Sequence, residues 1–127
     1  MKIRYSLLLG LALTLACPVP SLLADIIDDG EVVFKQCNVC HNITDDGTKK
    51  LGPNLGGVIG RKAGTLKGYG YSPAMATIGI IWNRETLDRF LTSPAVVVPA
   101  TRMTFPGLKE ATQRAAVIAF LEVQSES

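Results

Sequence analysis

Five consecutive residues constrain this 127-residue chain more than any other feature: two cysteines are separated by two residues, and the second is followed directly by the only histidine. The run is Cys37-Asn38-Val39-Cys40-His41. This spacing is the attachment pattern of c-type haem. Two thiols at a helix end add to the two vinyl groups on one edge of the porphyrin, and the next residue lies under the ring, where its imidazole ligates the iron. The sequence therefore predicts one covalently attached haem c, held by Cys37, Cys40 and His41.

Three other kinds of site use similar residues. A thioredoxin-like redox pair usually opens a helix within a βαβ unit, whereas this pair closes an expected helix that no strand precedes. A structural zinc site needs four protein ligands, and only Cys37, Cys40 and His41 lie together in the sequence. A disulfide between the two cysteines is a further alternative in an oxidising compartment. Haem attachment is favoured because the redox-pair and zinc patterns each lack a required partner, whereas the disulfide stays open as an alternative.

Three helices are expected around the motif. Acidic residues and apolar residues spaced three and four apart predict the first over residues 28–37. The second begins after the N-cap residue Asn83 and is ended by Pro94. An apolar stripe predicts the last helix over residues 109–123. No segment predicts a strand, so we expect an all-α fold.

Long irregular segments separate these helices. Residues 42–72 contain eight glycines and one proline, and residues 95–107 form a second expected loop. A compact domain rarely contains so much loop unless the chain wraps around something, and three short helices bury little apolar surface. We therefore expect three to five short helices and long loops wrapped around one haem, in a single domain over residues 25–127.

The first 24 residues have the pattern of a secretory signal peptide. Lys2 and Arg4 form a short basic region, an apolar run follows over residues 6–16, and the small residue Ala24 precedes Asp25. The apolar run is shorter than the roughly 20 residues of a membrane span. The sequence thus predicts export to the periplasm without membrane insertion after cleavage. Retention of residues 1–24 as an anchor is the alternative.

The same segment also affects lipidation and the net charge of the chain. Lipidation at Cys17 is a minor alternative to simple cleavage. The whole chain has 13 basic and 11 acidic residues, so loss of Lys2 and Arg4 leaves 11 of each and a net charge of zero. A domain with no net charge lacks the excess of positive charge that attracts nucleic acid, so we expect no nucleic-acid partner.

The sixth iron ligand is expected to be a methionine. With one histidine in the chain, a second imidazole ligand is impossible within one molecule, so a sixth ligand from the protein must be Met, Lys, Tyr or an amine. Apart from the initiator, the methionines are Met75 and Met103. Met103 lies in the proline-rich loop between the last two helices, which suits folding over the far face of the ring, whereas Met75 is expected to fill the core. Methionine ligation would raise the haem potential.

Over nearly all of residues 28–123 the chain resembles the class I cytochromes c, small carriers of one haem. The resemblance rests on an ordered series of segments: 30–37, 52–55, 60–64, 68–72, Trp82, 90–94 and 119–121. It implies that the carbonyl of Pro53 accepts the second ring hydrogen of His41. It also implies donors to the haem propionates from Arg61, Tyr71 and Trp82, with Tyr69 a weaker candidate. Gly30 and Phe34 would meet Val117 and Phe120 where the terminal helices cross.

The chain departs from its mitochondrial relatives at several positions. Phe90 stands where they carry Tyr, Ala100 where they carry Gly, and Arg102 where they carry Lys. Ala95 and Val96 replace lysines after the middle helix. The ring of lysines around the exposed haem edge is therefore depleted, and residues 96–98 with Arg102 are a candidate apolar contact patch.

These observations predict a periplasmic electron carrier rather than an enzyme. The iron would cycle between Fe(III) and Fe(II) by outer-sphere transfer, with His41 and Met103 retained as axial ligands. The protein would act as a monomer that forms transient complexes with donor and acceptor redox proteins. A haem-c subunit of a larger dehydrogenase or oxidase is the first alternative. A five-coordinate haem that binds gases or reacts with peroxide is the second, although no spare histidine exists as a distal base.

Overall fold

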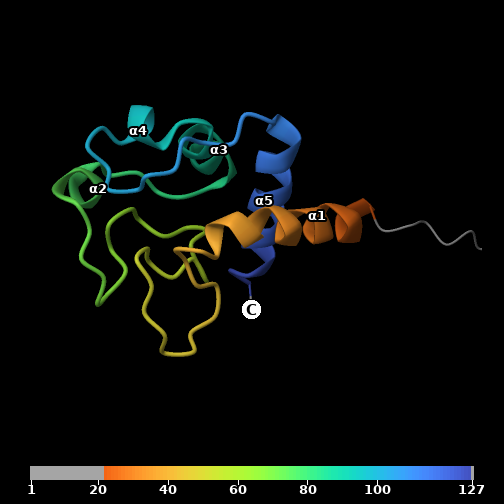
Figure 1. Cartoon of the computed structure of the whole chain (residues 1–127), viewed down its shortest axis with the longest axis horizontal. Helices are drawn as coiled ribbons and strands as arrows, with labels where there is room; N and C mark the ends of the chain where they lie inside the picture. The colour runs from red at the N-terminus through yellow and green to blue at the C-terminus, as the bar shows by residue number, and fades with distance from the viewer. Residues whose placement is uncertain (1–21, 127) are drawn as a thin grey trace, which may run out of the picture.

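The computed structural model describes residues 22–126 and contains helices but no strand in that range. The helices are α1 (Leu22–Cys37), α2 (Pro73–Thr77), α3 (Arg84–Thr92), α4 (Pro94–Val97) and α5 (Ala111–Val123). One isolated bridge pairs Lys62 with Ile81. In Figure 1, α1 and α5 cross, while α2, α3 and α4 lie together on one side of the long loops. The predicted all-α fold of short helices and long loops is confirmed.

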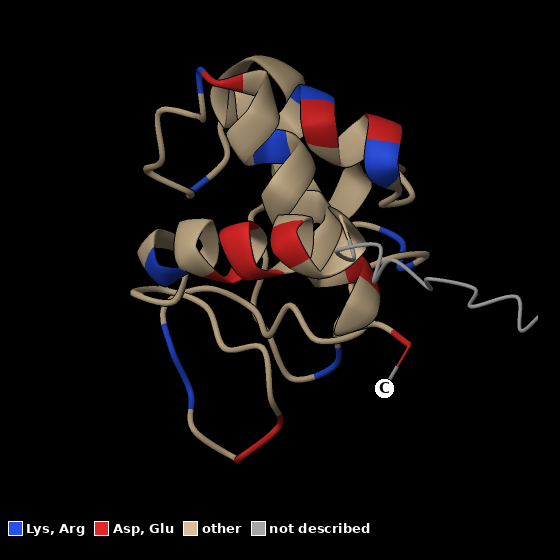
Figure 2. Cartoon of the chain, turned by 90° about the vertical axis from the view of Figure 1, so that its right-hand side faces the viewer, with Lys and Arg blue, Asp and Glu red and all other residues tan. Residues whose placement is uncertain are grey.

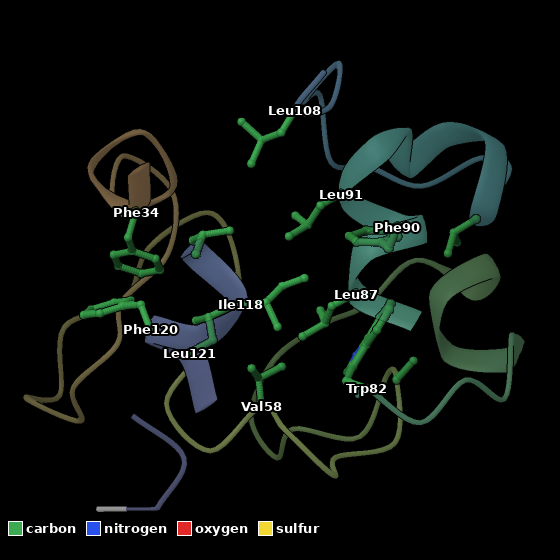
Figure 3. Close-up of a cluster of buried hydrophobic side chains, with 13 residues drawn as sticks. Phe34, Val58, Trp82, Leu87, Phe90, Leu91, Leu108, Ile118, Phe120 and Leu121 are labelled. Atoms are coloured by element: carbon green, nitrogen blue, oxygen red, sulfur yellow. The ribbon is translucent and has the colours of Figure 1, made fainter. Parts of the chain in front are cut away.

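The crossing of α1 and α5 depends on a glycine. An added Cβ at Gly30 would lie 2.1 Å from the carbonyl oxygen of Ala116 and 2.7 Å from Cβ of Phe120, so only glycine allows this approach. One turn later, the rings of Phe34 and Phe120 pack with centroids 5.2 Å apart, as Figure 3 shows. The expected contact between the terminal helices is therefore present.

Helix α3 begins and ends as the sequence predicts. The side chain of Asn83 accepts a hydrogen bond from the Thr86 amide at 2.9 Å, and the Thr86 hydroxyl accepts one from the Asn83 amide at 2.8 Å. This reciprocal capping box satisfies two amides at the start of the helix. Leu87, Phe90 and Leu91 form its buried face. The helix stops at Thr92, directly before Ser93 and Pro94.

The start of the first helix differs from the prediction. Helix α1 begins at Leu22 rather than at residue 28, so Asp25 is the acidic residue in its first turn. No proline or glycine interrupts residues 22–29, and Ile27 packs against the core cluster, which favours the additional turns. The expected boundary after Ala24 thus lies within a helix. The rest of the expected signal peptide, residues 1–21, lies outside the described residues.

Two short helices were not predicted. Helix α2 follows residue 72, where Ser72 caps the helix by accepting a hydrogen bond from the Met75 amide at 3.1 Å. Helix α4 occupies residues expected to open the second loop. Pro94 explains the second error, because proline not only stops a helix but also suits the first position of the next one.

The side chains of the core come from both terminal helices, from α3 and from the loops. Figure 3 shows Ile118 and Leu121 of α5 facing Leu87 of α3, with Trp82 and Phe90 on one side. The Trp82 and Phe90 rings lie 5.0 Å apart. No helix within residues 22–126 is long and apolar enough to cross a membrane.

Candidate haem-binding site

The Cys-x-x-Cys-His run forms a tight turn at the end of α1. Cys37 is the last residue of the helix, and its carbonyl accepts hydrogen bonds from the amides of Cys40 at 3.0 Å and His41 at 2.9 Å. The turn is joined to the next loop by a 2.7 Å bond from the Gly52 amide to the Cys40 carbonyl. Both cysteines and His41 are thereby directed to one region of the molecule.

The two thiols are free, so the disulfide alternative is not formed. Burial raises the pKa of Cys37 to about 11, an effect partly opposed by a hydrogen bond to the backbone. A thiol with this pKa is neutral at pH 7. Within residues 22–126 no group of three or more His, Cys, Asp or Glu side chains is placed to hold a metal ion. This distribution disfavours the structural zinc site.

His41 is buried and has a fixed orientation. Its Nδ1 donates a 2.7 Å hydrogen bond to the carbonyl of Pro53, so the proton resides on Nδ1 and Nε2 is left as the ligating nitrogen. Gly52 lies flat against the ring, since a Cβ there would be 2.4 Å from Cε1 of His41. Burial lowers the pKa of His41 and the charge of Lys50 lowers it further, while the bond to Pro53 opposes both. The neutral imidazole is the form that binds a metal.

An apolar cavity of about 630 Å³ opens beside this histidine. Its wall includes both cysteines, His41 and Pro53, together with Met75 and Met103. Most other lining residues are apolar or aromatic: Phe34, Val39, Leu51, Leu55, Val58, Trp82, Leu87, Phe90, Leu91, Phe105, Val117 and Leu121. Two thiols, an imidazole and two thioethers around one apolar space fit a covalently attached haem.

The four predicted propionate donors differ in their surroundings. Tyr69, Tyr71 and Trp82 line the cavity, whereas Arg61 is not among the lining residues. The Tyr69 hydroxyl donates to the Leu51 carbonyl at 2.7 Å. Neither the Tyr71 hydroxyl nor the Trp82 indole forms a hydrogen bond within residues 22–126. These two groups are therefore the available donors.

Arg61 instead supports the loop that carries Pro53. Its guanidinium donates to the carbonyls of Asn54 at 2.9 Å and Gly56 at 2.6 Å. The carbonyl of Arg61 accepts a hydrogen bond from the Trp82 amide at 2.9 Å. Arg61 therefore does not line the cavity itself. It binds the loop that carries Pro53 and the backbone of Trp82, and both of these residues line the cavity.

Both methionines lie at the cavity and both have constrained backbones. The Met103 amide donates to the Thr101 hydroxyl at 3.2 Å, and the Met75 amide donates to the Ser72 hydroxyl at 3.1 Å. Met75 and Met103 are each half-buried against the core cluster. Sequence reasoning missed that Met75 lines the cavity. The Ser72-Pro73 pair before it signals only that a helix starts there, and no local pattern shows that Met75 faces the cavity.

The contact surface at the cavity differs from the expected patch of residues 96–98. Val98 is fully buried in the core, whereas Val96 is 75 % exposed as expected, but neither lines the cavity. Two unpredicted side chains are the exposed apolar residues in the cavity wall: Val39, 77 % exposed, and Leu51, 85 % exposed. The Gly52–Cys40 hydrogen bond brings their two segments together. Arg102 also lines the cavity and donates to the Gly70 carbonyl at 3.0 Å.

Comparison with known proteins agrees with this site. Residues 27–125 match the family model described as Cytochrome c. The chain is 47% identical over 95 residues to cytochrome c2 of Rhodomicrobium vannielii, which covers 75% of this chain and 76% of that protein. It is 37% identical over 116 residues to cytochrome c2 of Blastochloris viridis, covering 91% of each chain. Cytochrome c 2.1 of Caenorhabditis elegans is 44% identical over 99 residues, covering 77% of this chain and 88% of its own. This chain therefore belongs to the cytochrome c family.

Proposed function

We propose that this small haem c electron-transfer protein is a periplasmic carrier whose iron is held by His41 and Met103. Membership of the family supports covalent haem c and an electron-transfer function. The observation that carries the proposal is the buried His41 ring, which is oriented by Pro53 at 2.7 Å beside an apolar cavity that also contains Met103. When bound, the haem iron supplies the one-electron Fe(III)/Fe(II) couple.

The residues on the histidine side resist rearrangement. Gly52 lies against the imidazole and Pro53 holds Nδ1, while Arg61 secures the loop through the Asn54 and Gly56 carbonyls. A ligand that cannot swing keeps the same geometry in both oxidation states. Electron transfer then proceeds with little reorganisation of the protein.

Met103 is the proposed sixth ligand. Its loop is fixed at one end by the bond from its own amide to Thr101 and near its middle by the bond from Arg102 to Gly70. A thioether on the iron favours the ferrous state and raises the potential. Met75, on the short helix α2, is proposed to pack against the haem instead.

Tyr71 and Trp82 are proposed to donate hydrogen bonds to the propionates. Both line the cavity, and neither the Tyr71 hydroxyl nor the Trp82 indole donates a hydrogen bond within residues 22–126. A buried carboxylate needs such donors, because burial without hydrogen bonds is costly. Tyr69 supports this wall, since its ring packs edge-on against Tyr71 with centroids 4.7 Å apart.

Redox partners are proposed to dock at the cavity mouth, where the cysteines, Val39 and Leu51 lie. Figure 2 shows several acidic residues along α1, which also carries Lys35 in its last turn, and both acidic and basic residues on other elements, so no single strongly basic face is present in the described part of the chain. Apolar contact would therefore contribute more to docking than a strongly basic face would. Such contacts suit transient complexes of a monomer.

Two measurements test whether the protein is an electron carrier: the rate of carbon monoxide binding and a redox titration. The purified ferrous holoprotein is expected to bind carbon monoxide slowly and to titrate as a reversible one-electron couple. Rapid binding by the unmodified protein would instead indicate a five-coordinate haem. Isolation of the protein in a stable complex with a dehydrogenase or oxidase would favour a fixed subunit over a free shuttle.

Periplasmic location is proposed from residues 1–24, which have the signal-peptide pattern. Intact mass spectrometry of the mature protein is the test. The expected mass corresponds to a chain that starts at Asp25 and carries one haem. An added fatty-acid mass on Cys17, or an intact Met1, would overturn the proposal of a cleaved and unanchored domain.

A further inference from the structure

The side chain of Lys50 closes the turn that carries His41. Its Nζ donates to the Asn38 carbonyl, to Oδ1 of Asn38 at 3.0 Å and to the His41 carbonyl at 3.1 Å. All three donors of an ammonium group are therefore used at one place. Lys50 is half-buried, so its charge is partly shielded from solvent.

The position of these carbonyls explains why a cation binds there. They lie just beyond Cys37, the last residue of α1, and the negative end of the helix dipole favours a cation at that end. Lys50 also lies three residues before Pro53, whose carbonyl orients the His41 ring. One side chain thus joins the backbone of the histidine to the segment that fixes its imidazole.

The charge of Lys50 acts on this site and on the neighbouring loop. It disfavours a positive charge on the His41 ring, and it helps to lower the pKa of the exposed Asp46. No ion pair between Lys50 and a carboxylate occurs within residues 22–126. The positive charge is therefore held beside the proximal ligand without direct neutralisation.

We propose that the fixed positive charge of Lys50 raises the reduction potential of the haem held by His41. The ferric form of the site carries one more positive charge than the ferrous form, so a nearby fixed cation stabilises the ferrous form. The three hydrogen bonds keep the ammonium from moving away when the iron is oxidised. This inference rests on the proposed ligation by His41.

The adjacent Lys49 provides a matched control. It carries the same charge one residue earlier, but it is exposed and has no hydrogen bond or ion pair in the described part of the chain. The variants to compare are Lys50→Met, Lys50→Gln, Lys50→Arg and Lys49→Met, each as the holoprotein. Two neutral replacements at residue 50 guard against a folding defect in either one.

The measurement is an optical redox titration of each variant. At the midpoint potential of the unmodified protein, the ferrous-to-ferric ratio is expected to fall about twofold in Lys50→Met and Lys50→Gln, which corresponds to a downward shift of about 18 mV for one electron. Lys49→Met should change the ratio much less. Lys50→Arg keeps the positive charge and should therefore stay close to the ratio of the unmodified protein. The shift should persist at high salt, because a half-buried charge is screened weakly.

Two outcomes separate this inference from the proposed function. If the neutral variants at residue 50 keep the absorption spectrum of the unmodified protein and also its potential, the role of Lys50 is refuted while His41 ligation stands. Equal shifts in Lys49→Met and Lys50→Met would likewise refute it, since general surface charge would then explain both. If the unmodified holoprotein lacks the spectrum of a histidine-ligated haem, the proposed function itself fails.

Discussion

Replacing Gly30 by alanine is the most specific perturbation of the crossing between α1 and α5. The new Cβ would lie 2.1 Å from the Ala116 carbonyl oxygen, 2.7 Å from its carbonyl carbon and 2.7 Å from Cβ of Phe120. Two of these atoms belong to the backbone of α5, so no side-chain rotation relieves the overlap. The helices must move apart, and the packing of Phe34 on Phe120 at 5.2 Å loosens with them.

The expected cost follows from opposing contributions. Alanine is favoured over glycine inside a helix by about 1 kcal/mol. Overpacking of this kind costs about 3 kcal/mol when the backbone must shift, and a weakened aromatic pair adds up to about 1 kcal/mol. Gly30→Ala should therefore lower the free energy of unfolding by about 2–3 kcal/mol.

Guanidinium unfolding of the holoprotein, followed by far-ultraviolet circular dichroism, measures this cost. With a denaturant dependence of about 4 kcal/mol/M, the midpoint should fall by roughly 0.5–0.75 M. Gly70→Ala is the control, because a Cβ at Gly70 meets no atom within 4 Å and its φ is not positive. That variant should stay within about 0.5 kcal/mol of the unmodified protein. A Gly30→Ala protein as stable as the original would refute the close crossing.

Three further substitutions test separate features. Gly52→Ala, whose Cβ would lie 2.4 Å from Cε1 of His41, should destabilise the holoprotein by about 1–3 kcal/mol in guanidinium unfolding; unchanged stability would contradict the packing of Gly52 on the ring. Ala100→Gly should raise stability by about 1 kcal/mol in thermal melts, because Ala100 has φ 65°; a lower Tm would oppose this. The pKa of the Asp46 carboxyl is held below its ordinary value chiefly by hydrogen bonds from Thr48. This contribution to stability is present above the ordinary pKa of 3.8 and is lost as the pH falls through the lower folded value. Thr48→Val should raise the pKa of Asp46 in a nuclear magnetic resonance titration, and no rise would contradict the assignment.

Local chemistry accounts for what the sequence predicted. The Cys-x-x-Cys-His spacing identifies the cofactor without any knowledge of the fold, and the Asn83 cap and Pro94 locate α3 because their effects are confined to neighbouring residues. The crossing of the terminal helices was expected only through the family resemblance, since Gly30 alone reads equally well as a helix start.

The remaining features depend on contacts between distant segments. The early start of α1 depends on packing of Ile27 against the core, which no local pattern reveals. Arg61 binds the Asn54 and Gly56 carbonyls because the loop folds back around its guanidinium. The presence of Met75 at the cavity follows from where α2 lies, and this position comes from tertiary packing.

The central claim, ligation of the iron by His41 and Met103, is tested most directly by the charge-transfer absorption between methionine sulfur and ferric iron. Met75 is the matched comparison, since both methionines line the same cavity. The ferric holoprotein should show the band, Met103→Ala should lose it and Met75→Ala should keep it. A band that survives in Met103→Ala, or that is absent from Met75→Ala, would contradict the account.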